Sequence, residues 1–219
     1  KINILDIGAN IGVYSIGFAL NSNTQVFSFE PYNKTFEILN HNINQNNFKN
    51  IQCYNFGLLN ENKELFLGYP QHETKYMSFF KYFDKYSLGS KTIYTGQKFD
   101  SLEKKSNFYI GDNISEIKNL DALGIIKIDV EGAEFEVLKG LEKTLSLYKP
   151  MICLETNSGY KNNNNDFDSI ILFLSKIGYE NIIELSKVLN KSSFKNPLSV
   201  QALISQAHQF KRSTDLLVY

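Results

Sequence analysis

Short apolar runs alternate along most of the chain with stretches in which apolar residues recur every three or four positions. Runs of the first kind are typical of buried strands, and the second spacing is typical of helices with one apolar face. The predicted strands are 2–6, 25–30, 51–55, 124–129, 151–155, 182–185 and 216–219. The predicted helices are 13–20, a segment around 36–43, 137–145 and 166–178. This alternation predicts an α/β fold in which helices cover both faces of a mostly parallel sheet.

Two stretches depart from this alternation. Residues 61–105 hold no long helical pattern, and within them Glu64–Gly68 and Lys91–Phe99 are predicted to pair as a hairpin inserted after the third strand. Between the two arms lie seven aromatic side chains: Tyr69, Tyr76, Phe79, Phe80, Tyr82, Phe83 and Tyr86. In the second stretch, residues 187–212, a helix is indicated by the spacing of Leu198, Ala202 and Leu203.

Length and composition narrow the class of protein. A chain of 219 residues suits one domain, 1–219, with an insertion at about 61–105. Since Lys1 stands almost at the first strand, we expect the chain to be an N-terminally trimmed piece. The 23 basic and 23 acidic side chains cancel, which argues against a nucleic-acid partner, and no apolar run approaches the ~20 residues of a membrane span. Cys53 and Cys153 each lie in an apolar run and indicate buried thiols in a reducing compartment, so we expect a cytoplasmic protein.

The first predicted strand leads directly into a turn that contains Asp6, Gly8, Asn10 and Gly12. A dinucleotide site requires G-x-G-x-x-G, but the second and third glycine positions here hold Asn10 and Val13. Asp6 places a carboxylate at the mouth of the turn, where it would repel a phosphate and attract an ammonium. S-adenosylmethionine has no phosphate and carries an ammonium, a sulfonium and a ribose diol, so the turn predicts a methyl-donor site. The alternative is a strand-to-helix turn whose glycines serve geometry alone.

Two further polar residues end the next two predicted strands. Glu30 follows Asp6 by 24 positions, and its carboxylate can accept hydrogen bonds from both ribose hydroxyls of a nucleoside. The alternative for Glu30 is a solvent-exposed acid that caps the following helix. Asn55 ends the third strand, where it either faces the adenine edge of the donor or is a plain turn residue.

Acidic residues also follow the fourth predicted strand. Ligands of open α/β sheets bind beyond the carboxyl ends of the strands, where a carboxylate is a base, a metal ligand or a helix cap. Asp129 is the first functional candidate among these acids and the first to test as a catalytic base. Glu131 has a functional or a structural role, and Glu134 is expected in the first turn of the next helix, where the dipole favours an acid. Glu155 ends the fifth strand in a similar way and is a further catalytic candidate. No Cys/His spacing indicates a metal site, and His72 is either a base or a surface histidine.

With these residues assembled, the chain resembles the FkbM-type family of S-adenosylmethionine-dependent methyltransferases. The resemblance covers about residues 2–185 together with 215–219. It rests on the segments Asp6–Gly12, Phe29–Pro31, Asp100–Leu102, Ile128–Glu134, Val137–Gly140 and Pro150–Glu155. It implies a Rossmann-like class I methyltransferase fold, with a seven-stranded, mostly parallel sheet whose last strand runs antiparallel.

The resemblance also implies an activity, the transfer of a methyl group to an oxygen of a sugar, glycolipid or secondary metabolite. It assigns Asp129 and Glu131 to the active site, and it assigns cofactor roles to Asp6, Gly8, Asn10, Gly12 and Glu30. Because sugars and planar rings stack on aromatic faces, we expect the aromatic-rich residues 69–90 to form part of the acceptor site. Two alternatives stay open, an NAD-linked oxidoreductase and a non-catalytic binding module on the same fold. The feature that separates catalysis from a scaffold is whether Asp129 and Glu131 face the ligand or merely cap a helix.

Overall fold

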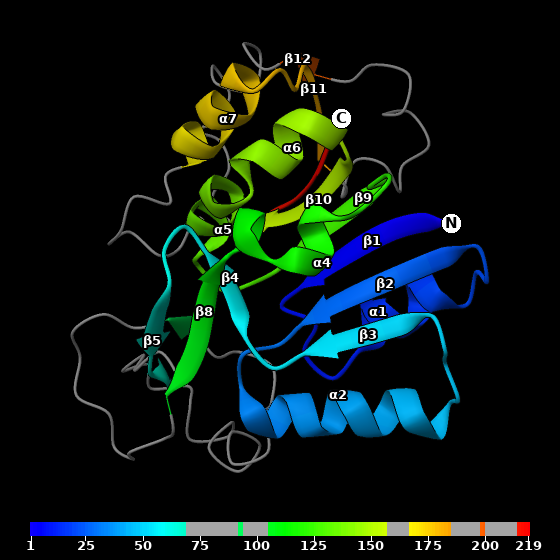
Figure 1. Cartoon of the computed structure of the whole chain (residues 1–219). Coiled ribbons are helices and arrows are strands. Elements are labelled where there is room, and N and C mark those ends of the chain that lie inside the picture. The colour runs from blue at the N-terminus through cyan, green and yellow to red at the C-terminus, as the bar shows by residue number, and fades with distance from the viewer. Residues whose placement is uncertain (69–91, 94–104, 157–166, 185–197, 200–213) are drawn as a thin grey trace, which may run out of the picture.

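The computed structural model of the protein describes residues 1–68, 92–93, 105–156, 167–184, 198–199 and 214–219. A central sheet of eight strands runs through them in the order β12-β11-β13-β10-β9-β1-β2-β3 (Figure 1). These strands are β1 (Ile2–Ile7), β2 (Thr24–Phe29), β3 (Ile51–Tyr54), β9 (Ile125–Ile128), β10 (Met151–Thr156), β11 (Asn181–Glu184), β12 (Leu198–Ser199) and β13 (Thr214–Val218). Neighbouring strands from β3 to β10 are parallel, whereas β13 is antiparallel to both β10 and β11.

Seven of these strands correspond to the seven predicted from the sequence, and the reversed direction of the last one, β13, is confirmed. The two-residue β12 is an eighth strand, so the helix predicted from Leu198 is wrong at its first residue: Leu198 is extended and pairs with Ile182 of β11. A few apolar residues at helical spacing do not distinguish a short edge strand from a helix. Ala202 and Leu203 lie outside the described residues.

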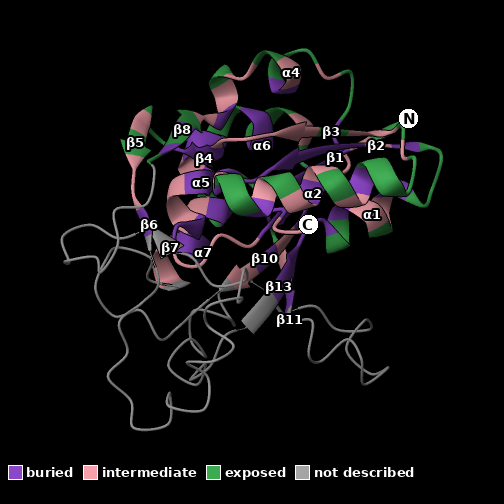
Figure 2. Ribbon diagram, turned by 90° about the horizontal axis from the view of Figure 1, so that it is seen from below, coloured by how far each residue is buried: buried purple, intermediate pink, exposed green. Residues whose placement is uncertain are grey.

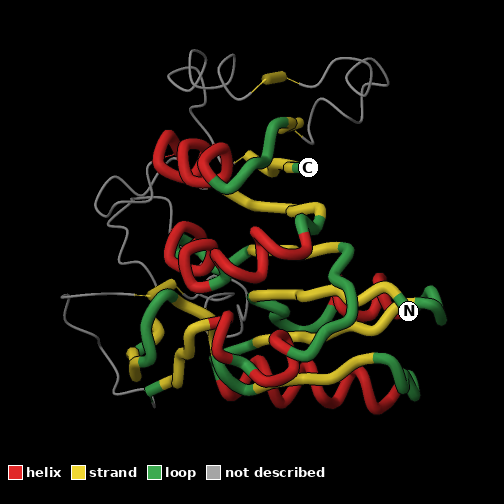
Figure 3. Tube along the Cα trace, turned by 45° about the horizontal axis from the view of Figure 1, so that its top comes forward, coloured by secondary structure: helices red, strands yellow, loops and turns green. Residues whose placement is uncertain are grey.

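Helices cover both faces of the sheet (Figure 3). On one face lie α1 (Val13–Ala19) and α2 (Asn33–Gln45), and on the other lie α5 (Glu134–Gly140), α6 (Glu142–Tyr148) and α7 (Phe167–Lys176). The short helix α4 (Ser115–Lys118) lies between β8 and β9 in the chain. Buried residues follow the central strands and recur along these helices (Figure 2). In the described part of the chain, no helix is both long and apolar enough to cross a membrane.

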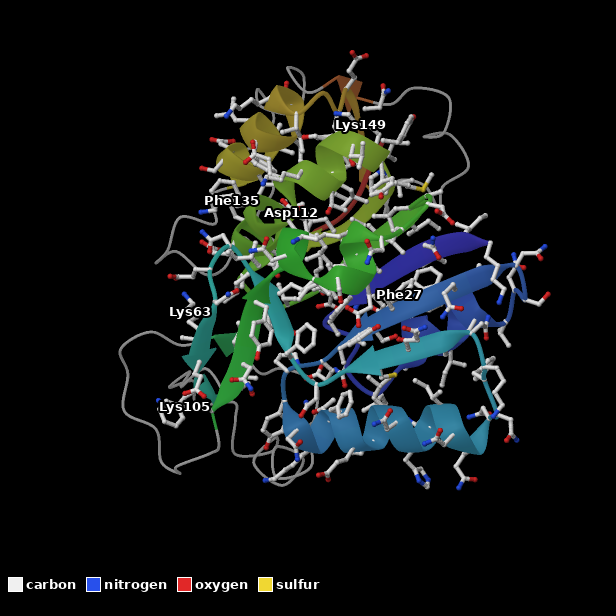
Figure 4. The ribbon with its side chains drawn as sticks, in the orientation of Figure 1. Phe27, Lys63, Lys105, Asp112, Phe135 and Lys149 are labelled. Atoms are coloured by element: carbon white, nitrogen blue, oxygen red, sulfur yellow. The ribbon has the colours of Figure 1, made fainter. Side chains whose placement is uncertain are left out.

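The single helix predicted over 137–145 is in fact two helices, α5 and α6, which meet at Leu141. Asp112, in the short 3-10 helix Gly111–Asn113, accepts hydrogen bonds from the backbone N–H groups of Lys143 and Thr144, so it caps the start of α6 from outside the helix (Figure 4). At the end of α5, a Cβ on Gly140 would lie 2.0 Å from the carbonyl oxygen of Leu59. Apolar spacing did not reveal this break because the buried positions continue across it.

A second, smaller sheet stands beside the carboxyl ends of the central strands (Figure 1). It has the order β4-β8-β5 and consists of β4 (Gly57–Leu59), β5 (Lys63–Leu65) and β8 (Ser106–Ile110). Next to it, β6 (Leu67–Gly68) pairs antiparallel with β7 (Thr92–Ile93), which confirms the predicted hairpin over these two residue pairs. For Glu64 and Leu65 the predicted hairpin is wrong, because they belong to β5 and pair with Asn107 and Ser106 of β8. Neither β4 nor β8 was predicted. The seven aromatic residues between 69 and 86, and His72, lie outside the described residues.

Candidate functional site

The turn after β1 is shaped by three residues in the left-handed region, Gly8, Asn10 and Gly12, with φ angles of 78°, 51° and 96°. A Cβ on Gly8 would lie 1.9 Å from the backbone oxygen of Asp129, so the turn and the end of β9 approach as closely as they do only because residue 8 is glycine. A Cβ on Gly12 would lie 2.7 Å from Leu39 of α2. The glycines therefore have a geometric role, as the structural alternative predicts.

A cleft lies where the carboxyl ends of β1, β2 and β9 meet the small sheet. It encloses about 690 Å³ of space, part of it open to solvent. Among the residues that the structure describes, the charged side chains that line it are all acidic: Glu30, Asp129 and Glu131. The other lining residues are Ile7, Gly8, Asn10, Pro31, Tyr32, Thr35, Gly57, Leu58, Leu67, Phe108, Val130 and Ala133. The cleft therefore has an acidic end and an apolar wall.

Glu30 directly follows β2 and is only 7% exposed. Its Oε2 accepts a hydrogen bond from the backbone N–H of Asn10 at 3.0 Å, and its Oε1 accepts one from the backbone N–H of Tyr32 at 2.9 Å. Burial raises the pKa of Glu30 to about 7, against the opposing effect of these two hydrogen bonds. Each carboxylate oxygen has two lone pairs, so both can still accept from a ligand. Glu30 is thus a buried residue of the cleft and not a solvent-exposed helix cap.

Asn55 lies just beyond β3 and contacts the backbone of Glu30. Its Nδ2 donates a hydrogen bond to the backbone carbonyl of Glu30 at 3.0 Å. Asn55 is half-buried and is not among the residues that line the cleft. Its predicted contact with the adenine edge stays a prediction, and the observed role is to hold the chain where Glu30 leaves the sheet.

Asp6 lies beneath the turn and not at its mouth, because its side chain is fully buried. Its Oδ2 accepts a hydrogen bond from Ser15 Oγ at 2.5 Å, and Ser15 Oγ in turn accepts one from Ser28 Oγ at 2.8 Å. Its Oδ1 is 3.4 Å from Lys127 Nζ. Burial raises the pKa of Asp6, whereas Lys127 and Ser15 act in the opposite direction. The ammonium that pairs with Asp6 in this structure is therefore that of Lys127, and not that of a ligand.

Lys127, on β9, is a site residue that the sequence reasoning missed. It is 7% exposed, and its Nζ lies 3.1 Å from the Gly8 carbonyl oxygen and 3.3 Å from Asp129 Oδ2. Burial opposes the charge of Lys127, but the attraction of Asp6 and Asp129 outweighs it and raises the pKa of Lys127. The available signal was one lysine in the otherwise apolar strand Ile125–Ile128, because a buried charge requires a partner.

The three acids after β9 have two different placements. Asp129 and Glu131 both line the cleft, and the Asp129 side chain is 31% exposed. Burial, and then the charge of Asp129, raise the pKa of Glu131, which is half-buried. Glu134 is buried in the first turn of α5, and its Oε1 accepts a hydrogen bond from the backbone N–H of Gly132 at 2.9 Å. The expected supporting role of Glu134 is therefore observed, and Asp129 and Glu131 face the cleft.

Glu155 is the predicted catalytic residue that the structure places apart from the others. It lies on β10, opposite Asp215 of β13, and it does not line the cleft. Of the nine predicted site residues, the structure brings five together in the cleft: Gly8, Asn10, Glu30, Asp129 and Glu131. Asn55 donates a hydrogen bond to the backbone of Glu30, Asp6 is connected to the cleft through Lys127, and Gly12 is a buried residue of the turn.

Comparisons with known proteins point to one family. The family model described as the methyltransferase FkbM domain matches residues 6–180. Methyltransferase 1 of Beauveria bassiana (strain ARSEF 2860) is 26% identical over 159 residues, which are 64% of this chain and 58% of that protein. The crystal structure of methyltransferase FkbM from Methylobacillus flagellatus KT has a TM-score of 0.58 at 18% identity, and the match covers all of this chain and 44% of that one. The chain therefore spans about half the length of these two relatives, and the second shows the fold alone.

Proposed function

Because the chain belongs to the FkbM methyltransferase family, we propose that it uses S-adenosylmethionine to methylate a hydroxyl group of a sugar, glycolipid or secondary metabolite. The observation that carries this proposal is the cleft, in which every charged lining side chain of the described residues is acidic. An acidic site favours a cationic donor, and it disfavours the pyrophosphate of a nicotinamide dinucleotide. The same observation weighs against the NAD-linked alternative.

The residues of the cleft fit such a donor. Glu30 would hold the ribose hydroxyls through the lone pairs that its two backbone hydrogen bonds leave available. The glycine turn brings the backbone at Gly8 and Asn10 to the acidic end, which suits the methionine portion. The apolar wall, with Leu58 and Phe108, suits the flat adenine ring.

The chemistry divides between the donor and the protein. When bound, the donor supplies a methyl group that bonds to the acceptor oxygen while its carbon–sulfur bond breaks and leaves the electron pair on sulfur. The acceptor hydroxyl loses its proton in that step, and we assign the proton to the Asp129 carboxylate. Glu131, in the same cleft, is the second candidate for the proton acceptor.

Cys53 and Cys153 are half-buried, where the sequence predicted buried thiols, and they are not joined in a disulfide. The lack of a disulfide between them supports the proposed cytoplasmic location.

Titration calorimetry of the purified chain with S-adenosylmethionine, its demethylated product and NAD tests this proposal. Heat with the first two ligands and none with NAD is expected. Folded protein that gives no heat with either donor or product would contradict the proposal, and heat with NAD alone would favour the oxidoreductase. A methylation assay on a panel of hydroxylated acceptors then separates an enzyme from a binding module, which would bind the donor without transfer.

A further inference from the structure

We propose that Lys127 is a positioning residue of this cleft, whose ammonium fixes the Asp129 carboxylate and the Gly8 carbonyl for the transfer step. The inference rests on the proposed function, since it gives Lys127 a role in the reaction assigned to Asp129. Lys127 does not line the cleft; it acts on the residues that do.

The ammonium of Lys127 donates one hydrogen bond, to a backbone carbonyl, and forms ion pairs with two carboxylates. Its partners are the Gly8 carbonyl oxygen at 3.1 Å, Asp129 Oδ2 at 3.3 Å and Asp6 Oδ1 at 3.4 Å. The ring of Tyr14, in α1, lies 4.9 Å from Nζ and adds a cation–π contact. The charge therefore joins β1, the glycine turn and the end of β9, each of which contributes residues to the lining of the cleft.

These contacts restrict the orientation of the Asp129 carboxylate. Asp129 is bound to the rest of the sheet by its backbone N–H, which donates to the carbonyl of Ile7, and its side chain is partly exposed. Holding Oδ2 on Lys127 selects one orientation of the carboxylate, and that orientation directs the second oxygen. A proton acceptor works only when it is held within hydrogen-bond reach of the proton, so losing the orientation lowers turnover.

A simpler alternative is that Lys127 only neutralises Asp6. That carboxylate is fully buried, and removing the partner of a buried charge costs about 3–5 kcal/mol. Lys127→Met alone would therefore lower stability whether Lys127 positions Asp129 or only neutralises Asp6. The variant Asp6→Asn removes the charge that needs neutralising and keeps an oxygen that can accept from Ser15. It provides a background on which the effect of Lys127 on Asp129 can be measured by itself.

On that background, four proteins form a cycle: Asp6→Asn, Asp6→Asn/Lys127→Met, Asp6→Asn/Asp129→Asn and the triple variant. We expect Lys127→Met to lower turnover at saturating donor and acceptor by roughly 10–100-fold where Asp129 is intact, and by less than about threefold where it is Asn. Thermal midpoints of the two Asp129-containing proteins are expected to lie close together. An equal loss on both backgrounds, or no loss on either, would overturn the proposal.

A second measurement needs no donor. The pKa of Lys127, followed by NMR of its side chain, is expected to fall in Asp129→Asn and to stay unchanged in Glu142→Gln, an exposed acid on α6. An unchanged Lys127 pKa in Asp129→Asn would show that the ion pair does not form, and would overturn the proposal whatever the activity. A lowered pKa in a protein that binds neither donor nor product would instead overturn the proposed function, and with it the role in transfer, while the ion pair itself would stand.

Discussion

Glu30 and Asp129 directly follow the two strands that flank β1, and both line the cleft, but they are held in different ways. Glu30 is buried, and two backbone N–H groups, of Asn10 and Tyr32, bind its carboxylate. Asp129 is partly exposed, and the side chain of Lys127 binds it. Backbone N–H groups thus hold the first acid, whereas the cationic side chain of Lys127, two positions before it in the chain, holds the second. A residue held by the backbone suits constant binding of a ligand, and one held by a single cation suits a proton acceptor.

The largest expected effect is a loss of turnover on substitution of Asp129. Asp129→Asn keeps the shape and polarity of the side chain but removes its ability to take a proton, so turnover should fall by roughly 10²–10⁴-fold while donor affinity changes little. A methylation assay and calorimetry on the same preparation measure both quantities, with Glu142→Gln as the matched control. Full turnover in Asp129→Asn would make this residue structural, and Glu131 and then Glu155 would have to be tested as the base.

Substitution of Glu30 should have the opposite effect, lowering donor affinity and leaving turnover nearly unchanged. Glu30→Gln replaces a charged acceptor by a neutral one, and a hydrogen bond to a charged group contributes about 1.5–3 kcal/mol. Donor affinity is therefore expected to fall roughly 10–150-fold, with little change in turnover at saturating donor. Calorimetry at pH 8 measures the first effect, and assays at high donor concentration measure the second. A loss of turnover without a loss of affinity would reverse the roles of the two acids.

Donor affinity should also depend on pH through Glu30. Burial raises the pKa of this carboxyl to about 7, and the protonated form is a weaker hydrogen-bond acceptor. As the pH falls through about 7, the donor dissociation constant is expected to rise by up to about tenfold per pH unit. Calorimetry from pH 5.5 to 8.5 follows this change, and Glu30→Gln should flatten it. An equally steep pH dependence in that variant would assign it to another group.

Glu134, a buried acid that does not line the cleft, should affect stability and not donor affinity. Burial raises the pKa of Glu134 to about 7 from 4.5, so the folded protein binds more protons than the unfolded chain between these values, and stability falls as the pH rises through this window. Each pKa unit is worth about 1.4 kcal/mol, so the loss from Glu134 is roughly 3 kcal/mol. Glu134→Gln, which keeps an acceptor for Gly132, should remove most of this dependence. Urea unfolding at pH 5 and pH 8 compares the two proteins, and identical pH dependence would contradict the assignment.

The difference between the two acids also explains how far the sequence could be interpreted. Glu30 and the glycine turn were predicted because strand, turn and acid follow one another at a spacing that the chain itself shows. Asp129 was predicted from its place after a strand, but the buried ion pair between Lys127 and Asp6 beside it was not, since that contact joins residues 121 positions apart in the sequence. The pairing of strands far apart, β1 with β9, creates that contact. The prediction that Asp6 lies at the mouth of the turn was wrong for the same reason. Its carboxylate is buried because it forms an ion pair with Lys127, and the sequence does not show that contact.

The small sheet shows the same limit in the fold. Its strands β4 and β8 have three and five residues, and they pair across a separation of about 50 positions. Such short strands carry no reliable alternation. Gly57 was not among the residues predicted to matter, although a Cβ there would lie 2.3 Å from the ring of Phe108, so this glycine lets the Phe108 ring pack against β4 within the small sheet. The long, periodic elements of the central sheet were predicted, and the short strands that complete the cleft were not.

The smallest expected effect separates support of Glu30 from direct ligand contact. Asn55→Ala removes one hydrogen bond to the Glu30 carbonyl, and a neutral hydrogen bond contributes about 0.5–1.5 kcal/mol, so donor affinity should fall roughly 2–10-fold. If Asn55 acts only through Glu30, the same change made in Glu30→Gln should add almost nothing, because residues that act through one contact are not additive. If Asn55 instead touches the adenine edge, the two losses should multiply. Calorimetry on the two single variants and the double variant decides between these roles, and a full multiplicative loss would restore Asn55 to the ligand contacts that the sequence suggested.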